Sequence, residues 1–276
     1  MRETGQATQP PPLWRAALPP GRVTLAGAGP GDPELLTLKA HAAIRAARLV
    51  LYDHLVSDGV LALLPIAAER IYVGKKNRDH SMAQQDIIQL LVAKARSGQP
   101  VLRLKGGDPY IFGRGGEETQ ALAAAGIPFE VIPGISAAQA MSAYAGIPLT
   151  HRDHAAAVVL ATGHCKDGTD DLDWPALARP RQTVVIYMGV GALGRICEQL
   201  VVHGLPASTP AAVVENASCP NQRVLRATLS ALPALAQANS VRAPALIVVG
   251  HVVDLARQLA PPGRLRPNME VLSTAE

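Results

Sequence analysis

The sequence predicts an α/β protein of two domains. Three observations support this fold class: the chain has 276 residues, 48% of them are apolar although only 3% are aromatic, and apolar runs alternate with Ala- and Leu-rich segments from Val23 onwards. A chain of this length can bury two modest cores. A core of Ala, Val, Leu and Ile is typical of sheets flanked by helices.

The first domain is predicted over residues 22–145, after a disordered Pro-rich leader at 1–21. Short apolar runs that end at Gly, Pro or Asp indicate strands, and the Ala83–Arg96 segment has a helix stop at Ser97-Gly98. Because strands alternate with helices, we expect a parallel sheet. The predicted strands are Val23–Ala28, Leu49–Tyr52, Ile71–Val73, Val101–Leu104 and Phe129–Ile132, and the predicted helices are Glu34–Ala46, Ala83–Arg96 and Ala137–Tyr144.

The second domain is predicted over residues 146–260 and is followed by a flexible tail at 261–276. The strand and helix alternation starts again here, which indicates a second α/β unit. The predicted strands are Ala156–Ala161, Thr183–Met188, Ala211–Val214, Arg223–Ala227 and Leu246–Val249, with helices at Leu193–His203 and Leu229–Gln237. The acidic stretch Asp167–Asp173 is read as a solvated loop.

Charge and cysteine usage narrow the class of function. The net charge is +4 and the sequence pI is about 9.1, but no Lys/Arg block occurs, so we expect a small anionic substrate and no nucleic acid. Cys165, Cys197 and Cys219 are far apart, and His151 and His154 have no further ligand pattern, so neither a disulfide framework nor a metal site is expected. No apolar run is long enough for a signal peptide or a membrane span, which favours a cytoplasmic protein without a membrane partner.

Two Gly-rich turns follow predicted strands and are candidate binding loops. The first, Gly27–Pro33, has Asp32 in place of the third Gly of a dinucleotide fingerprint, and the alternative is a plain strand-to-helix turn. The second, Arg103–Pro109 with Phe112–Glu118, has more Gly than a connection needs but lacks the Gly-Lys-Ser/Thr of a phosphate loop. Asp108 is expected at the carboxyl end of its strand, where ligands of α/β sheets bind.

A third Gly-rich turn keeps a different function open. Gly189–Gly194 is a complete G-x-G-x-x-G after a predicted strand, and Glu215 ends the next strand. Taken alone, this pattern indicates NAD binding and an oxidoreductase. Asp53 and Lys75 each lie just beyond a predicted strand, so they are candidates for acid and base work in a cleft, with surface charges as the alternative.

Taken together, these motifs resemble the uroporphyrinogen-III C-methyltransferases of the tetrapyrrole (precorrin-type) methylase family. The resemblance runs in order through almost everything from Val23 to Val253, which makes it more specific than any single Gly motif. The matching segments are Gly27–Pro33, Leu35–Leu38, Tyr52-Asp53, Val73–Lys75, Val101–Glu118, Pro133–Ala137, Tyr144–Arg152, Thr162–His164, Tyr187–Gly189, Val214–Asn216, Pro244-Ala245 and Val248–Gly250.

The resemblance implies a homodimer whose subunit has two α/β domains with S-adenosylmethionine in the cleft between them. Asp53 corresponds to the family's proposed proton acceptor and Lys75 to its proposed proton donor. Ser136 stands where Thr is frequent and Ala217 where Gly is frequent, and both exchanges keep a small side chain. The implied cofactor-binding residues are Pro30, Gly106, Gly107, Asp108, Ile111, Ser136, Ala137, Met188, Ala217 and Ala245.

The implied reaction is methylation of uroporphyrinogen III at ring carbons 2 and 7, which gives precorrin-2, a precursor of sirohaem, cobalamin and haem d1, and S-adenosylhomocysteine. The polycarboxylated substrate suggests bidentate contacts from arginines, and Arg103, Arg114 and Arg152 are the candidates. Some family members carry a dehydrogenase and chelatase module as well. Because only residues 1–22 precede Val23, we expect methylation alone. A tetrapyrrole carrier that uses the same cleft is the non-catalytic alternative.

Overall fold

The computed structural model describes residues 18–76, 80–163, 172–259 and 270–273. Most of the predicted leader, Cys165 and most of the 167–173 loop lie outside this part of the chain. The described residues form two compact units. Unit 1 contains the chain up to Ala28, Leu36–Tyr110 and Arg114–Gly134, and unit 2 contains Gly29–Leu35, Ile111–Gly113 and the chain from Ile135.

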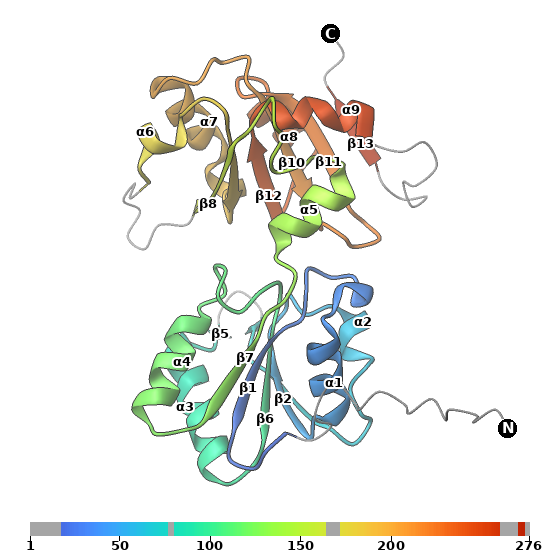
Figure 1. Cartoon of the computed structure of the whole chain (residues 1–276), viewed down its shortest axis with the longest axis vertical. Coiled ribbons are helices and arrows are strands. Elements are labelled where there is room, and N and C mark those ends of the chain that lie inside the picture. Colours follow the sequence, from blue (N-terminus) through green and yellow to red (C-terminus); the bar gives the residue numbers. More distant parts are fainter. Residues whose placement is uncertain (1–17, 77–79, 164–171, 260–269, 274–276) are drawn as a thin grey trace, which may run out of the picture. The chain divides into compact units, whose positions relative to one another are not determined.

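Unit 1 is a five-stranded sheet in the order β3-β2-β6-β1-β7, and every strand pair is parallel, as predicted. Figure 1 shows α1 and α2 on one face of this sheet and α3 and α4 on the other. A short antiparallel pair, β4 with β5, follows β3. The elements are β1 Val23–Gly27, α1 Leu38–Ala46, β2 Leu49–Tyr52, α2 Asp58–Leu61, β3 Glu69–Tyr72, β4 Lys75–Lys76, β5 His80–Ser81, α3 Gln84–Arg96, β6 Val101–Lys105, α4 Gly115–Ala124 and β7 Phe129–Ile132.

The central strand β6 sends its side chains alternately to the two faces, as the pleat of a strand requires. Leu102 and Leu104 pack with α1 and α2, and Val101 packs with α3 and α4. Arg103 and Lys105 share the parity of Val101 and are buried at 2% and 4% exposure. This alternation puts two cations beneath α3 and α4.

Unit 2 contains a mixed sheet in the order β13-β11-β10-β12-β9-β8. The pairs β8/β9 and β11/β13 are parallel, and the other three are antiparallel. The elements are the 3-10 helix η1 Pro33–Leu35, α5 Ala137–Ala145, β8 Ala157–Thr162, α6 Trp174–Leu177, β9 Gln182–Tyr187, η2 Val190–Ala192, α7 Leu193–Val202, β10 Pro210–Glu215, β11 Arg223–Thr228, α8 Leu232–Ala238, β12 Ala245–Val249, η3 His251–Leu255, α9 Ala256–Leu259 and β13 Glu270–Ser273.

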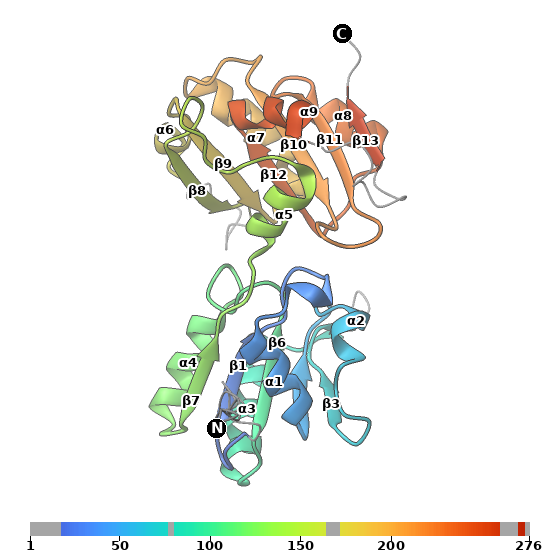
Figure 2. The same ribbon diagram turned by 45° about the vertical axis from the view of Figure 1, so that its right-hand side comes forward.

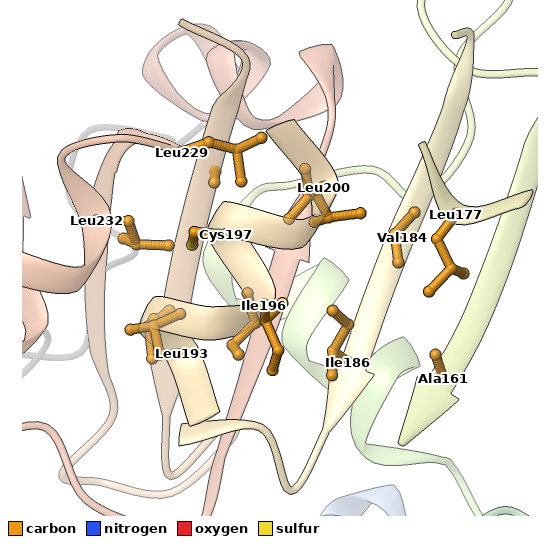
Figure 3. Packing of buried hydrophobic residues seen from close by; sticks show 14 of the residues in the cluster. Ala161, Leu177, Val184, Ile186, Leu193, Ile196, Cys197, Leu200, Leu229 and Leu232 are labelled. Carbon is orange, nitrogen blue, oxygen red and sulfur yellow. The ribbon is translucent and has the colours of Figure 1, made fainter. Parts of the chain in front are cut away.

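Helices cover both faces of this sheet, and Figure 2 shows α5 and α9 on one of them. On the other face, α7 presents Leu193, Ile196, Cys197 and Leu200 to the core that Figure 3 shows in close view. Their spacing of three, four and seven residues is that of one helix face. The strand β9 contributes to both cores, because consecutive strand residues point to opposite faces.

Three local differences from the expected elements follow from capping and packing. The helix expected over Glu34–Ala46 is divided, because the Thr37 hydroxyl accepts a hydrogen bond from the Ala40 backbone N–H and starts α1 at Leu38. Helix α5, placed by sequence in the first domain, packs in unit 2, where Ala138 and Met141 are buried. Residues 270–273, placed by sequence in the tail, form β13 alongside β11.

Candidate functional site

The Pro30 turn is held in unit 2 through the buried Asp32. The Asp32 backbone N–H donates to the Ser218 hydroxyl at 3.4 Å, and the Tyr144 hydroxyl donates to Asp32 Oδ2 at 2.7 Å. The Gln222 side chain, also buried, accepts from the Ser218 N–H at 2.8 Å and donates to the Tyr144 carbonyl at 3.2 Å. Three segments far apart in sequence are therefore tied together at this turn.

Ala217, Ala245 and Met188 lie at one end of the central strands of the unit 2 sheet, where β10 and β9 end and β12 begins. Glu215 at the end of β10 pairs with Ala245 at the start of β12, and Leu246 pairs with Tyr187 at the end of β9. The turns that follow are tight: Met188 has a φ of 55°, and the residues on either side of Ala217 have φ values of 48° and 67°. Ala217 and Ala245 therefore present backbone and small side chains here, and Met188 adds a side chain that is 53% exposed.

The start of α5 belongs to the same unit. Ser136 caps the helix in a reciprocal capping box with Gln139, at distances of 3.3 and 3.0 Å. The Ala138 backbone N–H donates to the Tyr187 hydroxyl at 3.0 Å, which ties this helix end to the end of β9. Ile111, Ala137 and Ala217 all pack against one buried cluster of this unit.

Seven of the ten predicted cofactor residues are therefore in unit 2, and Gly106, Gly107 and Asp108 are in unit 1. A Cβ on Gly106 would lie 2.5 Å from the Leu55 Cβ. Asp108 accepts hydrogen bonds at both carboxylate oxygens, from the Tyr110 N–H at 2.8 Å and from the Gly134 N–H at 3.0 Å. These contacts fix the loop after β6 against the turn after β7.

Asp53, the predicted proton acceptor, directly follows β2 and joins a charge cluster in unit 1 whose other members, Arg103, Lys105 and Glu118, are buried. Its Oδ2 lies 3.2 Å from Arg103 Nη2, and Glu118 Oε1 lies 3.4 Å from the same nitrogen and 2.8 Å from Lys105 Nζ. Burial, followed by the nearby charge of Arg103, lowers the pKa of Lys105.

The three predicted substrate arginines differ in burial and in their partners. Arg103 is only 3% exposed at its side chain, whereas Arg114 forms a bidentate pair with Glu117 at 2.8 and 2.7 Å, and Arg152 is exposed on a loop of unit 2. The hydrogen bonds that Arg114 donates to Glu117 raise the pKa of Arg114. Lys75 opens β4 and pairs with Ser81 in the strand ladder.

The sequence assigned a role to Ser136 but none to Lys105, Asp32 or Glu118. Lys105 was readable as a charge inside an apolar strand, and Ser136 with Gln139 was readable as a capping box. No local pattern marks Asp32 as the partner of Tyr144, because the two residues are 112 positions apart. Glu118 lies at the end of a Gly-rich motif, and nothing in that motif marks it as a buried acid.

The Gly189–Gly194 fingerprint opens a helix and does not build a ribose site. Gly189 lies where a Cβ would meet Ile247, Ile196 and Ile186 at 2.7 to 3.0 Å, so its role is close packing. Glu215 is 3% exposed, forms an ion pair with Arg223 and accepts the Arg242 N–H at 2.6 Å. With its carboxylate used in this way, the expected recognition of a ribose by Glu215 is not supported. In the part of the chain that the structure describes, no helix is long and apolar enough to span a membrane.

Similarity to known proteins defines the class. The chain belongs to the tetrapyrrole (corrin/porphyrin) methylases, whose family model matches residues 22–233. This confirms the family and the fold class expected from the ordered motifs.

Comparison with individual proteins shows which members of the family this chain resembles. The uroporphyrin-III C-methyltransferase from Thermus thermophilus, solved in complex with S-adenyl homocysteine, is 43% identical with a TM-score of 0.73, and the match covers 85% of this chain and 99% of that one. A cobalt precorrin-4 methyltransferase structure is 26% identical with a TM-score of 0.76, over 85% of this chain and 96% of that one. The siroheme synthase of Nitrosomonas europaea is 55% identical over 242 residues, 88% of this chain and 51% of the relative. The chain thus spans about half the length of such curated relatives.

Proposed function

We propose that the chain is an S-adenosylmethionine-dependent C-methyltransferase that methylates uroporphyrinogen III at ring carbons 2 and 7 to give precorrin-2. The observation that carries the proposal is the 43% identity to a uroporphyrin-III C-methyltransferase along 99% of that chain. The turns described above support it, because Pro30, Ala217 and Ala245 offer the small side chains and backbone groups that an extended cofactor needs for close approach.

Methyl transfer is a displacement in which a nucleophilic ring carbon forms a bond to the methyl carbon while the methyl–sulfur bond breaks. The donor supplies an activated methyl group, and the protein supplies alignment. Positive charge disappears from the sulfur during this step, so an environment of backbone and small apolar groups is favourable. Ala217, Ala245 and the backbone of the turn at Met188, all in unit 2, are proposed to provide it.

The methylated ring must then lose a proton, and we assign this step to Asp53. A carboxylate is a suitable acceptor when it is ionised and accessible. The Asp53 side chain is 22% exposed and is held on its other side by Arg103. Lys75 is proposed as the proton donor, in line with the family.

The substrate carboxylates are proposed to bind Arg152 and Arg114, whose side chain is 53% exposed and would exchange the Glu117 carboxylate for one of the substrate. Arg103 fits a positioning role better than a direct substrate contact, because its guanidinium is buried and occupied by Asp53, Glu118 and the Leu104 carbonyl. Replacement of Arg114 by Lys should raise the KM for uroporphyrinogen III, since the forked geometry of two hydrogen bonds is lost. The KM for the methyl donor should stay the same.

Two experiments test the activity. Incubation with uroporphyrinogen III and methyl-labelled S-adenosylmethionine should place label on the ring, whereas a tetrapyrrole carrier would leave the ring unlabelled. Calorimetric titration should show binding of S-adenosylhomocysteine and none of NAD. Preferential binding of NAD would refute the proposal.

A substitution tests the proton acceptor. Asp53→Asn should lower kcat by roughly 100-fold or more, because general base catalysis contributes about 10²–10⁴-fold. Binding of S-adenosylhomocysteine should be nearly unaffected. An unchanged kcat would remove Asp53 from the mechanism.

We further propose that the protein is a cytoplasmic homodimer. The support is the family resemblance, and sedimentation equilibrium over a range of concentrations tests the oligomeric state. A mass equal to one chain at micromolar concentration would refute the dimer.

A further inference from the structure

The charge cluster beneath α3 and α4 in unit 1 contains an acid that has no part in the proposed chemistry. Glu118, in the first turns of α4, has a side chain that is 0% exposed. A carboxylate in this position is costly unless opposite charges and hydrogen bonds compensate it. The surroundings of Glu118 therefore show what the acid holds in place.

A single oxygen of Glu118 accepts all the hydrogen bonds that surround the group. Lys105 Nζ lies 2.8 Å from Oε1, Gln84 Nε2 lies 3.2 Å away, and both Nε and Nη2 of Arg103 lie 3.4 Å away. Glu118 Oε2 is buried and has no hydrogen-bond partner among the described residues. The carboxylate is thus directed at the two cations of β6.

These contacts fix the orientation of the Arg103 guanidinium. Glu118 holds its Nε edge, the Leu104 carbonyl accepts from Nη1 at 2.7 Å, and Nη2 is left facing Asp53 Oδ2 at 3.2 Å. Because the guanidinium is planar and rigid, fixing one edge fixes the direction of the others. The backbone N–H of Leu55 donates to Asp53 Oδ1 at 3.2 Å, so the carboxylate is held through both oxygens.

The four charged groups are two cations and two anions, and Asp53 differs from the others. Arg103, Lys105 and Glu118 are exposed by 3%, 4% and 0% at their side chains, whereas Asp53 is exposed by 22%. The buried three therefore form the support for the one carboxylate that a substrate can reach. The parallel pairing of Leu51 with Arg103 brings the end of β2 next to this support.

We propose that Glu118 is a positioning residue for methylation: it fixes the Arg103 guanidinium, which in turn holds the Asp53 carboxylate that receives the ring proton. The inference rests on the proposed role of Asp53. A catalytic group whose support is removed moves by a fraction of an ångström, and misplacement of about 1 Å can cost about 100-fold in rate. The effect should therefore fall on kcat and leave cofactor binding unchanged.

The first test is Glu118→Gln, measured by steady-state kinetics with uroporphyrinogen III and by titration with S-adenosylhomocysteine. The amide keeps the shape but loses the charge, so its hydrogen bonds to Arg103 weaken to roughly half their strength. We expect kcat to fall by about 10- to 100-fold, with the KM for the methyl donor and the Kd of S-adenosylhomocysteine unchanged. The matched control is Glu69→Gln, an exposed acid of unit 1 paired with Lys94, which should leave kcat unchanged.

The second test separates positioning from folding. Glu118→Met/Lys105→Met removes one charge of each sign and leaves Arg103 paired with Asp53, an exchange that proteins often tolerate without loss of stability. We expect a thermal midpoint close to that of the original chain and a kcat as low as that of Glu118→Gln. Lys105→Met alone, which keeps Glu118 on Arg103, should lose much less of kcat.

The third test asks whether Glu118 acts through Asp53. In a chain that already carries Asp53→Asn, the further change Glu118→Gln should cost no additional kcat, since residues that act as a unit are not additive. A full additional loss in that background, or a folded Glu118→Gln enzyme with the original kcat, would overturn the inference while leaving the proposed activity intact. If neither Asp53→Asn nor Glu118→Gln lowered kcat, both residue roles would be refuted. If the original chain did not methylate the ring, the proposed function itself would be refuted.

Discussion

Replacement of Gly27 by Ala tests how the Gly106-Gly107-Asp108 loop is held. Gly27 ends β1, and a Cβ at this position would lie 2.6 Å from the Gly107 carbonyl oxygen and 2.6 Å from both Cα and N of Gly134. Ordinary van der Waals contact begins at 3.4 Å, so the two turns would have to move by about 0.8 Å. All three atoms are backbone, which leaves no flexible side chain to give way.

The expected cost follows from this geometry. Overpacking a tight site destabilises by about 1–3 kcal/mol, and the lower entropy of an Ala-containing unfolded chain offsets about 0.4–1 kcal/mol of it. We therefore expect Gly27→Ala to lower the free energy of unfolding by about 1–2 kcal/mol, as measured by urea denaturation. Displacement of Gly107 should also weaken binding of S-adenosylhomocysteine by roughly tenfold, about 1.4 kcal/mol.

Gly116 provides a matched control in the same unit. It lies in the first turn of α4, its φ is not positive, and a Cβ there would meet nothing within 4 Å. Gly116→Ala should therefore stabilise the helix by about 0.5–1 kcal/mol and leave cofactor binding unchanged. If Gly27→Ala were as stable as Gly116→Ala and bound S-adenosylhomocysteine as tightly, the close approach of the three backbone segments would be refuted.

Three further predictions concern unit 2. Ser136→Ala should cost about 1 kcal/mol in urea denaturation, because it removes the α5 cap, whereas Ser136→Thr should keep it; equal losses would contradict the capping role. Tyr144→Phe should lower the free energy of unfolding by about 1.5–3 kcal/mol, the value of a hydrogen bond to a charged group. It should also raise the Kd of S-adenosylhomocysteine by loosening the Pro30 turn. An unchanged Kd would show that this hydrogen bond stabilises the fold without affecting cofactor binding. Burial raises the pKa of the Cys197 thiol to about 12. The free energy of unfolding that this raised pKa contributes is therefore complete below about pH 9 and is lost as the pH rises towards 12. Between pH 8.5 and 10 this loss should reach roughly 1–2 kcal/mol in urea denaturation, and it should be absent in Cys197→Ala. Equal slopes of the free energy of unfolding against pH in the two proteins would refute the prediction.

Much of the fold is readable from the sequence because local signals agree with the packing. The predicted bounds of Leu49–Tyr52 and Phe129–Ile132 match β2 and β7, and the Ala83–Arg96 helix is correct to within one residue. Each segment is an apolar run or a periodic stretch that ends at a turn residue, so its local preference and its burial coincide.

The division into units is not readable in the same way. Gly29–Leu35 continues directly from β1 but belongs to unit 2, because Asp32 bonds to Tyr144 and Ser218. Contacts over such sequence separations depend on the whole fold and leave no periodic pattern. Pro30 is therefore a predicted cofactor residue through the family resemblance alone, and the hydrogen bonds of Asp32 explain why its turn packs in unit 2.

The placement of Arg103 is the most instructive difference. The spacing of Val101, Arg103 and Lys105 predicts that all three point to one face of a strand, but it does not say that helices cover both faces. Exchange of a buried ion pair for apolar residues is often neutral or stabilising, so stability alone does not explain why two cations lie inside a central strand. A support for Asp53 explains the first of them, Arg103, because β6 is a neighbour of β2 and the Arg103 guanidinium joins Asp53 at the end of β2 to Glu118 on α4. The apolar pattern of the strand is thus broken where the proposed proton acceptor needs a fixed partner, which is where such breaks are expected in an enzyme.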